Sequence, residues 1–68
     1  MNSCPVMAHG GLELLRNYDG YTTWYTVVFE DNYGTKQELL YAPDYSIASF
    51  AFTACRELMD ALEIGPDG

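Results

Sequence analysis

The sequence has three Cys and His side chains that could serve as a nucleophile, a base or a metal ligand. Cys4 and His9 lie near the N-terminus, and Cys55 lies far along the chain. Nucleophilic catalysis needs a nucleophile, a base and a group that orients the base, and nothing near Cys4 and His9 suggests a third member or a pocket. The three residues also lack any spacing typical of a zinc site. We therefore expect no catalysis, no metal and no cofactor, and we expect Cys55 to be a buried thiol.

Acidic side chains form the most prominent remaining pattern. The chain has ten Asp and Glu residues against three Lys and Arg, which gives a formal charge of −7. One acidic group recurs every three residues on a predicted helix, about 4.5 Å per step along its axis, and a second surrounds a predicted turn. DNA spaces its phosphates about 3.4 Å apart along each strand, so the two groups could form a DNA-like stripe if they share a surface. The groups are Glu57, Asp60 and Glu63, and Glu30, Asp31 and Glu38. The alternative is an ordinary solvated surface.

The negative charge restricts the class of partner. Direct binding to nucleic acid requires a basic footprint, and an anionic membrane surface would repel this chain. The sequence offers no stretch of about 18 apolar residues and no signal-peptide pattern. Two separated cysteines are too few for a disulfide scaffold. We expect a cytoplasmic protein whose partner has a basic surface, although the charge could serve solubility alone.

The elements that would position these side chains fit one domain, residues 1–68. Residues 1–11 lack periodicity and contain Pro5 and Gly10-Gly11, which predicts an irregular N-terminal arm. Residues 12–41 predict an antiparallel sheet of three strands, because β-branched and aromatic residues alternate between turn signals. The strands are Leu12–Tyr18, Tyr21–Glu30 and Thr35–Tyr41. For the first of them, a short helical turn is the alternative.

The turns between these strands have recognisable chemistry. Asp19-Gly20 predicts a two-residue turn, which needs positive φ at both positions. Asp31–Gly34 predicts a turn in which Asp and Asn bond their own backbone and Gly supplies a positive φ. In the third strand, alternation predicts that Leu40 lies on the same side as Glu38, opposite Leu39.

A helix is predicted over residues 46–62. Asp44 or Ser46 could cap its N-terminus, and Gly65-Pro66 would end it. Its apolar positions recur at helical spacing and predict the face that packs on the sheet. These positions are Ile47, Ala51, Ala54, Cys55, Leu58 and Leu62, widened by Phe50, Phe52 and Met59.

The order of elements predicts an α+β fold, β-β-β-α, with the helix packed on one face of the sheet. A single helix leaves the other face without cover, and aromatic residues make up 15% of the chain. Exposed aromatic surface is typical of an interface, in which Trp24, Tyr25 and Tyr33 would be the anchors.

In size, charge and order of elements, the chain resembles small phage-encoded inhibitors, including many anti-CRISPR proteins. The resemblance implies an inhibitor that blocks a basic, nucleic-acid-binding surface of a host defence complex, in the host cytoplasm. The alternative is a structural domain that self-assembles, for which a homodimer is the commonest form. The residues expected to bind the partner are Trp24, Tyr25, Glu30, Asp31, Tyr33, Glu38, Glu57, Asp60 and Glu63.

Overall fold

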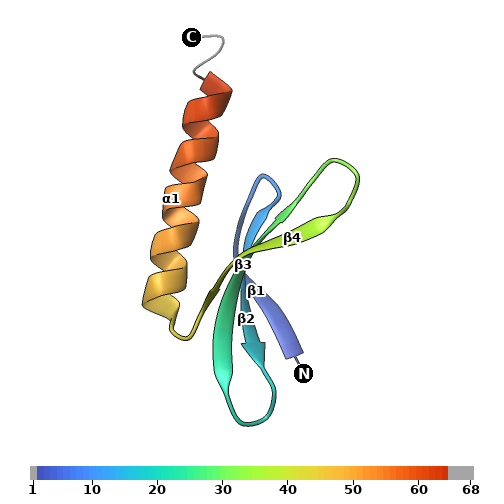
Figure 1. The fold of residues 1–68 in the computed structure, drawn as a ribbon, viewed down its shortest axis with the longest axis vertical. Coiled ribbons are helices and arrows are strands. Elements are labelled where there is room, and N and C mark those ends of the chain that lie inside the picture. Colours follow the sequence, from blue (N-terminus) through green and yellow to red (C-terminus); the bar gives the residue numbers. More distant parts are fainter. Residues whose placement is uncertain (1, 65–68) are drawn as a thin grey trace.

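A four-stranded antiparallel sheet followed by one helix makes up the fold (Figure 1). The computed structural model describes residues 2–64, with side chains described through Leu62. The elements are β1 (Asn2–His9), β2 (Leu12–Tyr18), β3 (Thr23–Glu30), β4 (Lys36–Ala42) and α1 (Tyr45–Ile64). The strands form a meander in the order β1-β2-β3-β4. The α+β class and the C-terminal helix are confirmed, but the sheet has four strands and not the predicted three.

The extra strand is β1, so the predicted irregular arm is wrong over residues 2–9. Gly10 and Gly11 join β1 to β2 with φ values of 54° and 89°. Two residues with positive φ match the twist of a hairpin, and Gly adopts such angles without a clash of its Cβ. Pro5 is tolerated because β1 is an edge strand, and the pairing shifts by a bulge between Pro5 and Met7.

The connection between β2 and β3 is longer than predicted. Tyr18 pairs with Thr23, so residues 19–22 form a four-residue loop. Only glycines have positive φ in the described chain, so Asp19 cannot occupy the predicted turn position. Its Oδ1 instead accepts hydrogen bonds from the backbone N–H groups of Tyr21 and Thr22, each at 2.8 Å. This loop removes Tyr21 and Thr22 from the predicted strand.

The turn between β3 and β4 forms where it was predicted, with the expected role of Asp31 but no side-chain hydrogen bond from Asn32 among the described residues. Asp31 Oδ1 accepts hydrogen bonds from the backbone N–H groups of Tyr33 and Thr35, each at 2.9 Å. Gly34 supplies a φ of 83°. Beyond the turn, Val27 pairs with Leu40 and Val28 with Glu38, which leaves Leu39 as a bulged residue.

The bulge corrects the predicted faces of β4. Strand alternation fails at an extra residue, because two residues then oppose one partner. Leu40 therefore lies on the same face as its partner Val27, opposite Glu38, which pairs with Val28. The predicted grouping of Leu40 with Glu38 is wrong.

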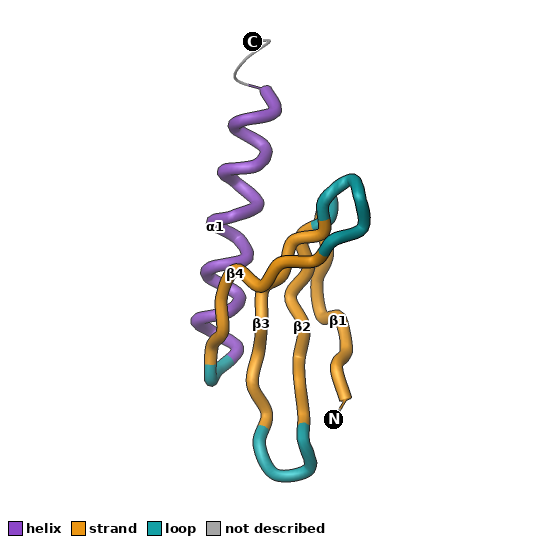
Figure 2. Tube along the Cα trace, turned by 45° about the vertical axis from the view of Figure 1, so that its right-hand side comes forward, coloured by secondary structure: helices purple, strands orange, loops and turns teal. Residues whose placement is uncertain are grey.

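Helix α1 begins at the predicted place. Asp44 Oδ1 accepts a hydrogen bond from the backbone N–H of Ile47 at 3.0 Å, so Asp44 is the cap and Ser46 is not. The helix continues to Ile64, and the predicted Gly65-Pro66 stop lies outside the described residues. We call the sheet face that α1 covers the front face; the helix lies on this side only (Figure 2).

The core lies between α1 and the front face, but the predicted helix stripe is displaced. The core residues are Leu12, Leu14, Val27, Ala42, Ala48 and Phe52, with Cys55 and Met59 partly buried against them. Ile47, Leu58 and Leu62, which the stripe included, are exposed. The apolar arc of α1 is wider than the strip that the sheet contacts, and its hydropathy alone does not tell which part is covered.

Candidate partner-binding surface

The sheet face opposite α1, which we call the back face, presents large apolar side chains. These side chains come from two neighbouring rows of paired residues. In the first row, Asn17 pairs with Trp24. The second row aligns Pro5, Leu15, Thr26 and Tyr41. Trp24 and Leu15 are half-buried, and Tyr41 is 58% exposed. These side chains have no helix over them, because α1 contacts the sheet from the front.

A chain of polar side chains crosses the back face beneath these residues. Ser3 Oγ donates a hydrogen bond to Asn17 Oδ1 at 2.6 Å, and Asn17 Nδ2 donates to Thr26 Oγ1 at 3.2 Å. Asn17 and Thr26 are both buried. Buried polar groups are stable only when hydrogen-bonded, so these two bonds fix β1, β2 and β3 to one another and hold the face in one arrangement.

Carboxylates occupy one end of the same face. Glu13 and Glu38 flank Val28 in one row, and Glu30 pairs with Lys36 in the next. Lys36 Nζ lies 3.5 Å from Glu13 Oε1. Three carboxylates and one ammonium leave this end of the back face negatively charged.

The structure places three of the nine predicted partner-binding residues on one face of the sheet. Trp24, Glu30 and Glu38 all lie on the back face, according to the strand register. Tyr25 lies on the front face, where its ring meets that of Tyr45 edge-on, with centroids 5.7 Å apart and an interplanar angle of 69°. Tyr33 lies in the loop between β3 and β4 and is 93% exposed.

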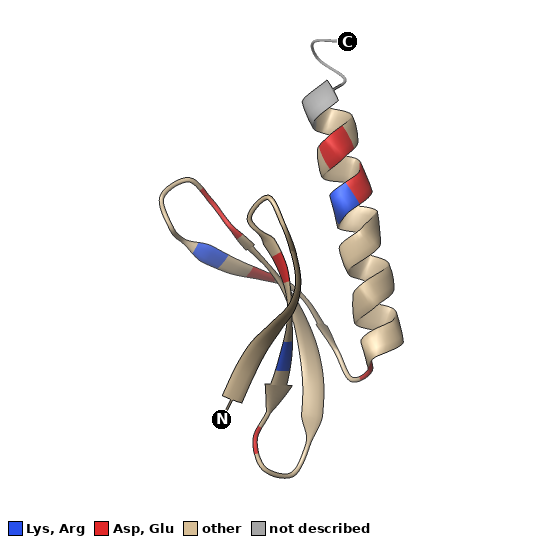
Figure 3. Ribbon diagram, turned by 180° about the vertical axis from the view of Figure 1, so that it is seen from behind, with Lys and Arg blue, Asp and Glu red and all other residues tan. Residues whose placement is uncertain are grey.

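The other predicted acidic residues lie elsewhere. Asp31 binds the backbone of its own turn through Oδ1. Glu57 is exposed on α1, and Asp60 Oδ1 lies 3.1 Å from His9 Nε2. The side chain of Glu63 lies outside the described residues. Figure 3 shows the acidic segments of α1 and of the β3–β4 hairpin well separated, so the described carboxylates do not form the predicted continuous stripe.

Sequence reasoning missed Glu13, Leu15 and Tyr41 as members of this surface. The alternation in β2 places Glu13 and Leu15 on one side, opposite Leu12 and Leu14. This alternation would have been sufficient to assign Glu13 and Leu15 to the back face. Tyr41 was hidden by the bulge at Leu39, because a count of two along β4 gives the wrong face.

The described chain offers little for other kinds of site. Over residues 2–62, whose side chains are described, no group of three or more His, Cys, Asp or Glu side chains could hold a metal ion. Cys4 is exposed and Cys55 half-buried, and both are free thiols. The one helix among the described residues is not apolar enough over a sufficient length to cross a membrane.

Comparisons of the chain with protein-family models, with curated proteins and with solved structures return no match.

Proposed function

We propose that this chain is a small non-catalytic domain that binds a basic surface of another protein through the back face of its sheet. The observation that carries the proposal is that one sheet face combines the half-buried Trp24 and the exposed Tyr41 with a surplus of carboxylates. Trp24 and Tyr41 would anchor the contact, and Glu30 and Glu38 would meet cations of the partner.

The two parts of the surface would contribute differently to binding. Aromatic side chains at the centre of an interface typically supply most of its energy. Rim charges mainly steer the encounter and select the partner, and their effect weakens with salt. The hydrogen bonds from Ser3 through Asn17 to Thr26 fix the face beforehand, which lowers the ordering cost of association.

The charge of −7 supports a basic partner. A basic surface that normally binds nucleic acid is one such partner, and blocking it would make this chain an inhibitor of the kind that the anti-CRISPR resemblance implies. The acidic helix residues do not extend the back face, so the proposal depends on apolar docking with an acidic rim and not on imitation of a regular DNA charge pattern.

Partner capture with matched variants tests the proposal. The immobilised full chain is exposed to host-cell lysate at low salt, captured proteins are identified, and each candidate is purified and titrated against the chain by calorimetry. The variant Glu30→Gln/Glu38→Gln should weaken binding roughly tenfold, about 1.4 kcal/mol. Its control, Glu57→Gln/Asp60→Asn, removes two charges from α1 and should leave affinity within about twofold.

A second pair of variants tests the aromatic part. Tyr41→Ser removes an exposed ring from the back face, whereas Tyr21→Ser removes one from the β2–β3 loop. Only the first should weaken binding. Equal effects of the paired variants would rule the back face out as the docking surface. An affinity that stays constant from low to high salt would rule out a basic partner.

Self-association is the second candidate, and a different surface favours it. Helix α1 exposes a row of four large apolar side chains: Ile47, Phe50, Leu58 and Leu62. Next to this row, an open apolar groove of about 310 Å³ lies between α1 and the sheet, lined by Leu12, Phe29, Leu39, Cys55, Leu58 and Met59. A second copy could cover the same row and groove in a symmetric dimer.

A further inference from the structure

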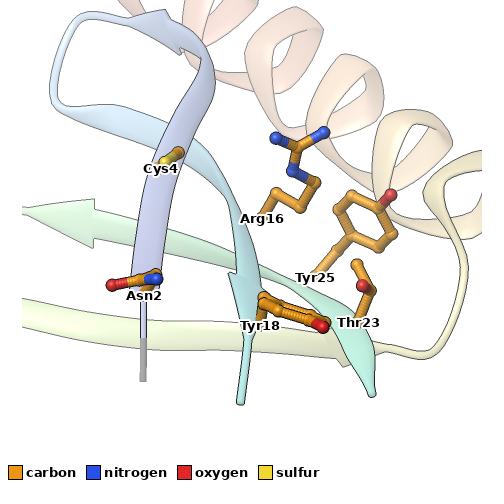
Figure 4. Close-up of a pocket in the computed structure, with 6 residues that line it drawn as sticks. All are labelled: Asn2, Cys4, Arg16, Tyr18, Thr23 and Tyr25. Carbon is orange, nitrogen blue, oxygen red and sulfur yellow. The ribbon is translucent and has the colours of Figure 1, made fainter. Parts of the chain in front are cut away.

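A second cavity lies on the front face, where the sheet extends beyond α1. It has a volume of about 500 Å³ and is open to solvent. Two neighbouring rows of paired residues build it, one from Asn2, Tyr18 and Thr23 and the other from Cys4, Arg16 and Tyr25. Figure 4 shows these six side chains on three adjacent strands, with the Arg16 guanidinium and the Tyr25 ring both directed along the side of the sheet where α1 lies.

The chemistry of the lining is unlike that of the rest of the molecule. The chain has ten acidic residues, yet no carboxylate of the described residues lines this cavity. Arg16 is the only charged side chain among the described lining residues. It makes no salt bridge with the described residues, whereas Lys36 and His9 each face a carboxylate. The remaining polar groups are hydroxyls, an amide and a thiol, all of which can donate hydrogen bonds.

The acidic residue closest in sequence to a lining residue of the cavity makes its hydrogen bonds within its own loop. Asp19 follows Tyr18, but its Oδ1 accepts hydrogen bonds from the backbone of its own loop. The Arg16 side chain is thereby left without a partner from that loop. A guanidinium presents its N–H groups in a planar fork that matches an oxyanion with two parallel hydrogen bonds.

The walls of the cavity are aromatic. Tyr25 packs partly against the core and meets Tyr45 of α1 edge-on, so its ring is supported from the side of the helix. Tyr18 stands on the neighbouring strand. Two phenol rings give apolar sides to a cavity whose size is typical of small-molecule sites, and their hydroxyls add donors.

We propose that this cavity binds a small aromatic or other apolar molecule bearing an oxyanion. The Arg16 guanidinium holds the oxyanion, and the rings of Tyr18 and Tyr25 contact the apolar part. The carboxylate and the phosphate monoester are the two sources of such an oxyanion, and they share this recognition chemistry. The site lies on the face opposite the proposed partner-binding surface and is independent of it.

Four probes at constant ionic strength and pH 7.5 test the site: inorganic phosphate, phenyl phosphate, acetate and benzoate. Binding is followed through the backbone amide resonances of the full-length chain by two-dimensional NMR. Phenyl phosphate or benzoate should shift the amides of Cys4, Arg16 and Tyr25 saturably, with a dissociation constant on the order of 1 mM. The aromatic probe should bind more tightly than the matching small ion, because only the aromatic probe contacts both tyrosine rings.

The matched variants are Arg16→Gln and Arg56→Gln, which remove the same charge from the cavity and from the exposed side of α1. Arg16→Gln should weaken binding roughly tenfold or more, while Arg56→Gln should leave it unchanged. The unshifted amides of α1 report whether each variant is folded. Preference for phenyl phosphate or for benzoate identifies the source of the oxyanion. Shifts that do not saturate with any probe, or that persist equally in Arg16→Gln, would overturn the proposal.

Discussion

At the scale of single residues, three aspartates bind backbone instead of a partner. Asp19, Asp31 and Asp44 each accept backbone N–H groups at a turn or at the start of α1. The roles of Asp31 and Asp44 could be predicted from the sequence, because an Asp side chain satisfies nearby N–H groups by local geometry alone. The role of Asp19 could not, because Asp-Gly fits both a two-residue turn and the longer loop that forms.

The loop of Asp19 predicts a dependence of stability on pH. The hydrogen bond from the backbone of Thr22, followed by that from Tyr21, lowers the pKa of the Asp19 carboxyl below its ordinary value. Because the pKa of Asp19 is lower in the folded than in the unfolded state, the ionised carboxylate stabilises the fold. This stabilisation is fully present when the pH is above the pKa of the unfolded state, which is near 3.9. This contribution is lost as the pH falls through the lower, folded pKa.

Two measurements check this prediction. The carboxyl carbon of Asp19, followed by NMR, should titrate with a midpoint below about 3.9. The difference in urea stability between the wild type and Asp19→Asn should be constant above about pH 5 and shrink in more acidic solution. A midpoint at or above the ordinary value would contradict the hydrogen-bonding account.

At the scale of elements, the sequence predicted those features that depend on residue type and on hydrogen bonds between residues close in the chain. The central strand and the start of α1 follow from residue type and capping. β1 was not predicted, because its residues have weak strand preference and because Gly10-Gly11 fits an irregular segment as well as a hairpin turn. The faces of β4 were misassigned because a bulge depends on the partner strand, and no alternation rule reveals it.

The hairpin between β1 and β2 should be sensitive to substitution at Gly11. An added Cβ would lie 2.8 Å from the backbone oxygen of Glu30, and the φ of 89° already disfavours other residues. At Gly20, φ is 100° but a Cβ would meet nothing within 4 Å. Gly20→Ala should cost about 1–2 kcal/mol for the backbone angle, and Gly11→Ala should cost about 1–3 kcal/mol more for the clash.

Urea unfolding of the two variants beside the wild type measures the difference. Because both glycines have positive φ, the comparison isolates the contact with β3. Equal losses of stability for the Gly11 and Gly20 variants would show that the clash of the added Cβ with Glu30 costs no stability. The contact between the hairpin and β3 would then not be tight.

At the scale of the whole molecule, the chain is extended for its length. Its radius of gyration is 13.1 Å, and its dimensions are 47 × 27 × 15 Å. A compact domain of this size would have a radius near 11 Å. The sequence predicted that one helix would leave apolar surface uncovered, and three of the residues proposed to bind a partner, Trp24, Glu30 and Glu38, lie on the back face. It could not predict that the helix itself would leave Phe50 79% exposed, because that depends on how the helix is rotated against the sheet.

The two candidate functions predict opposite effects of salt. Binding to a basic partner should weaken as salt rises, because screening removes the attraction. Self-association brings together two chains that each carry a charge of −7, so screening should strengthen it. Sedimentation equilibrium from about 10 to 500 µM chain, in the range where weak dimers form, should detect a dimer that grows with salt if the exposed row on α1 joins two copies.

Phe50→Ser should shift that dimer towards monomer, and Glu57→Gln, its control on the same helix, should strengthen it slightly by lowering the repulsion. A chain that stays monomeric at the highest concentration in both low and high salt would exclude self-association through α1. The exposed row on α1 would then remain available, like the back face, for binding a different protein.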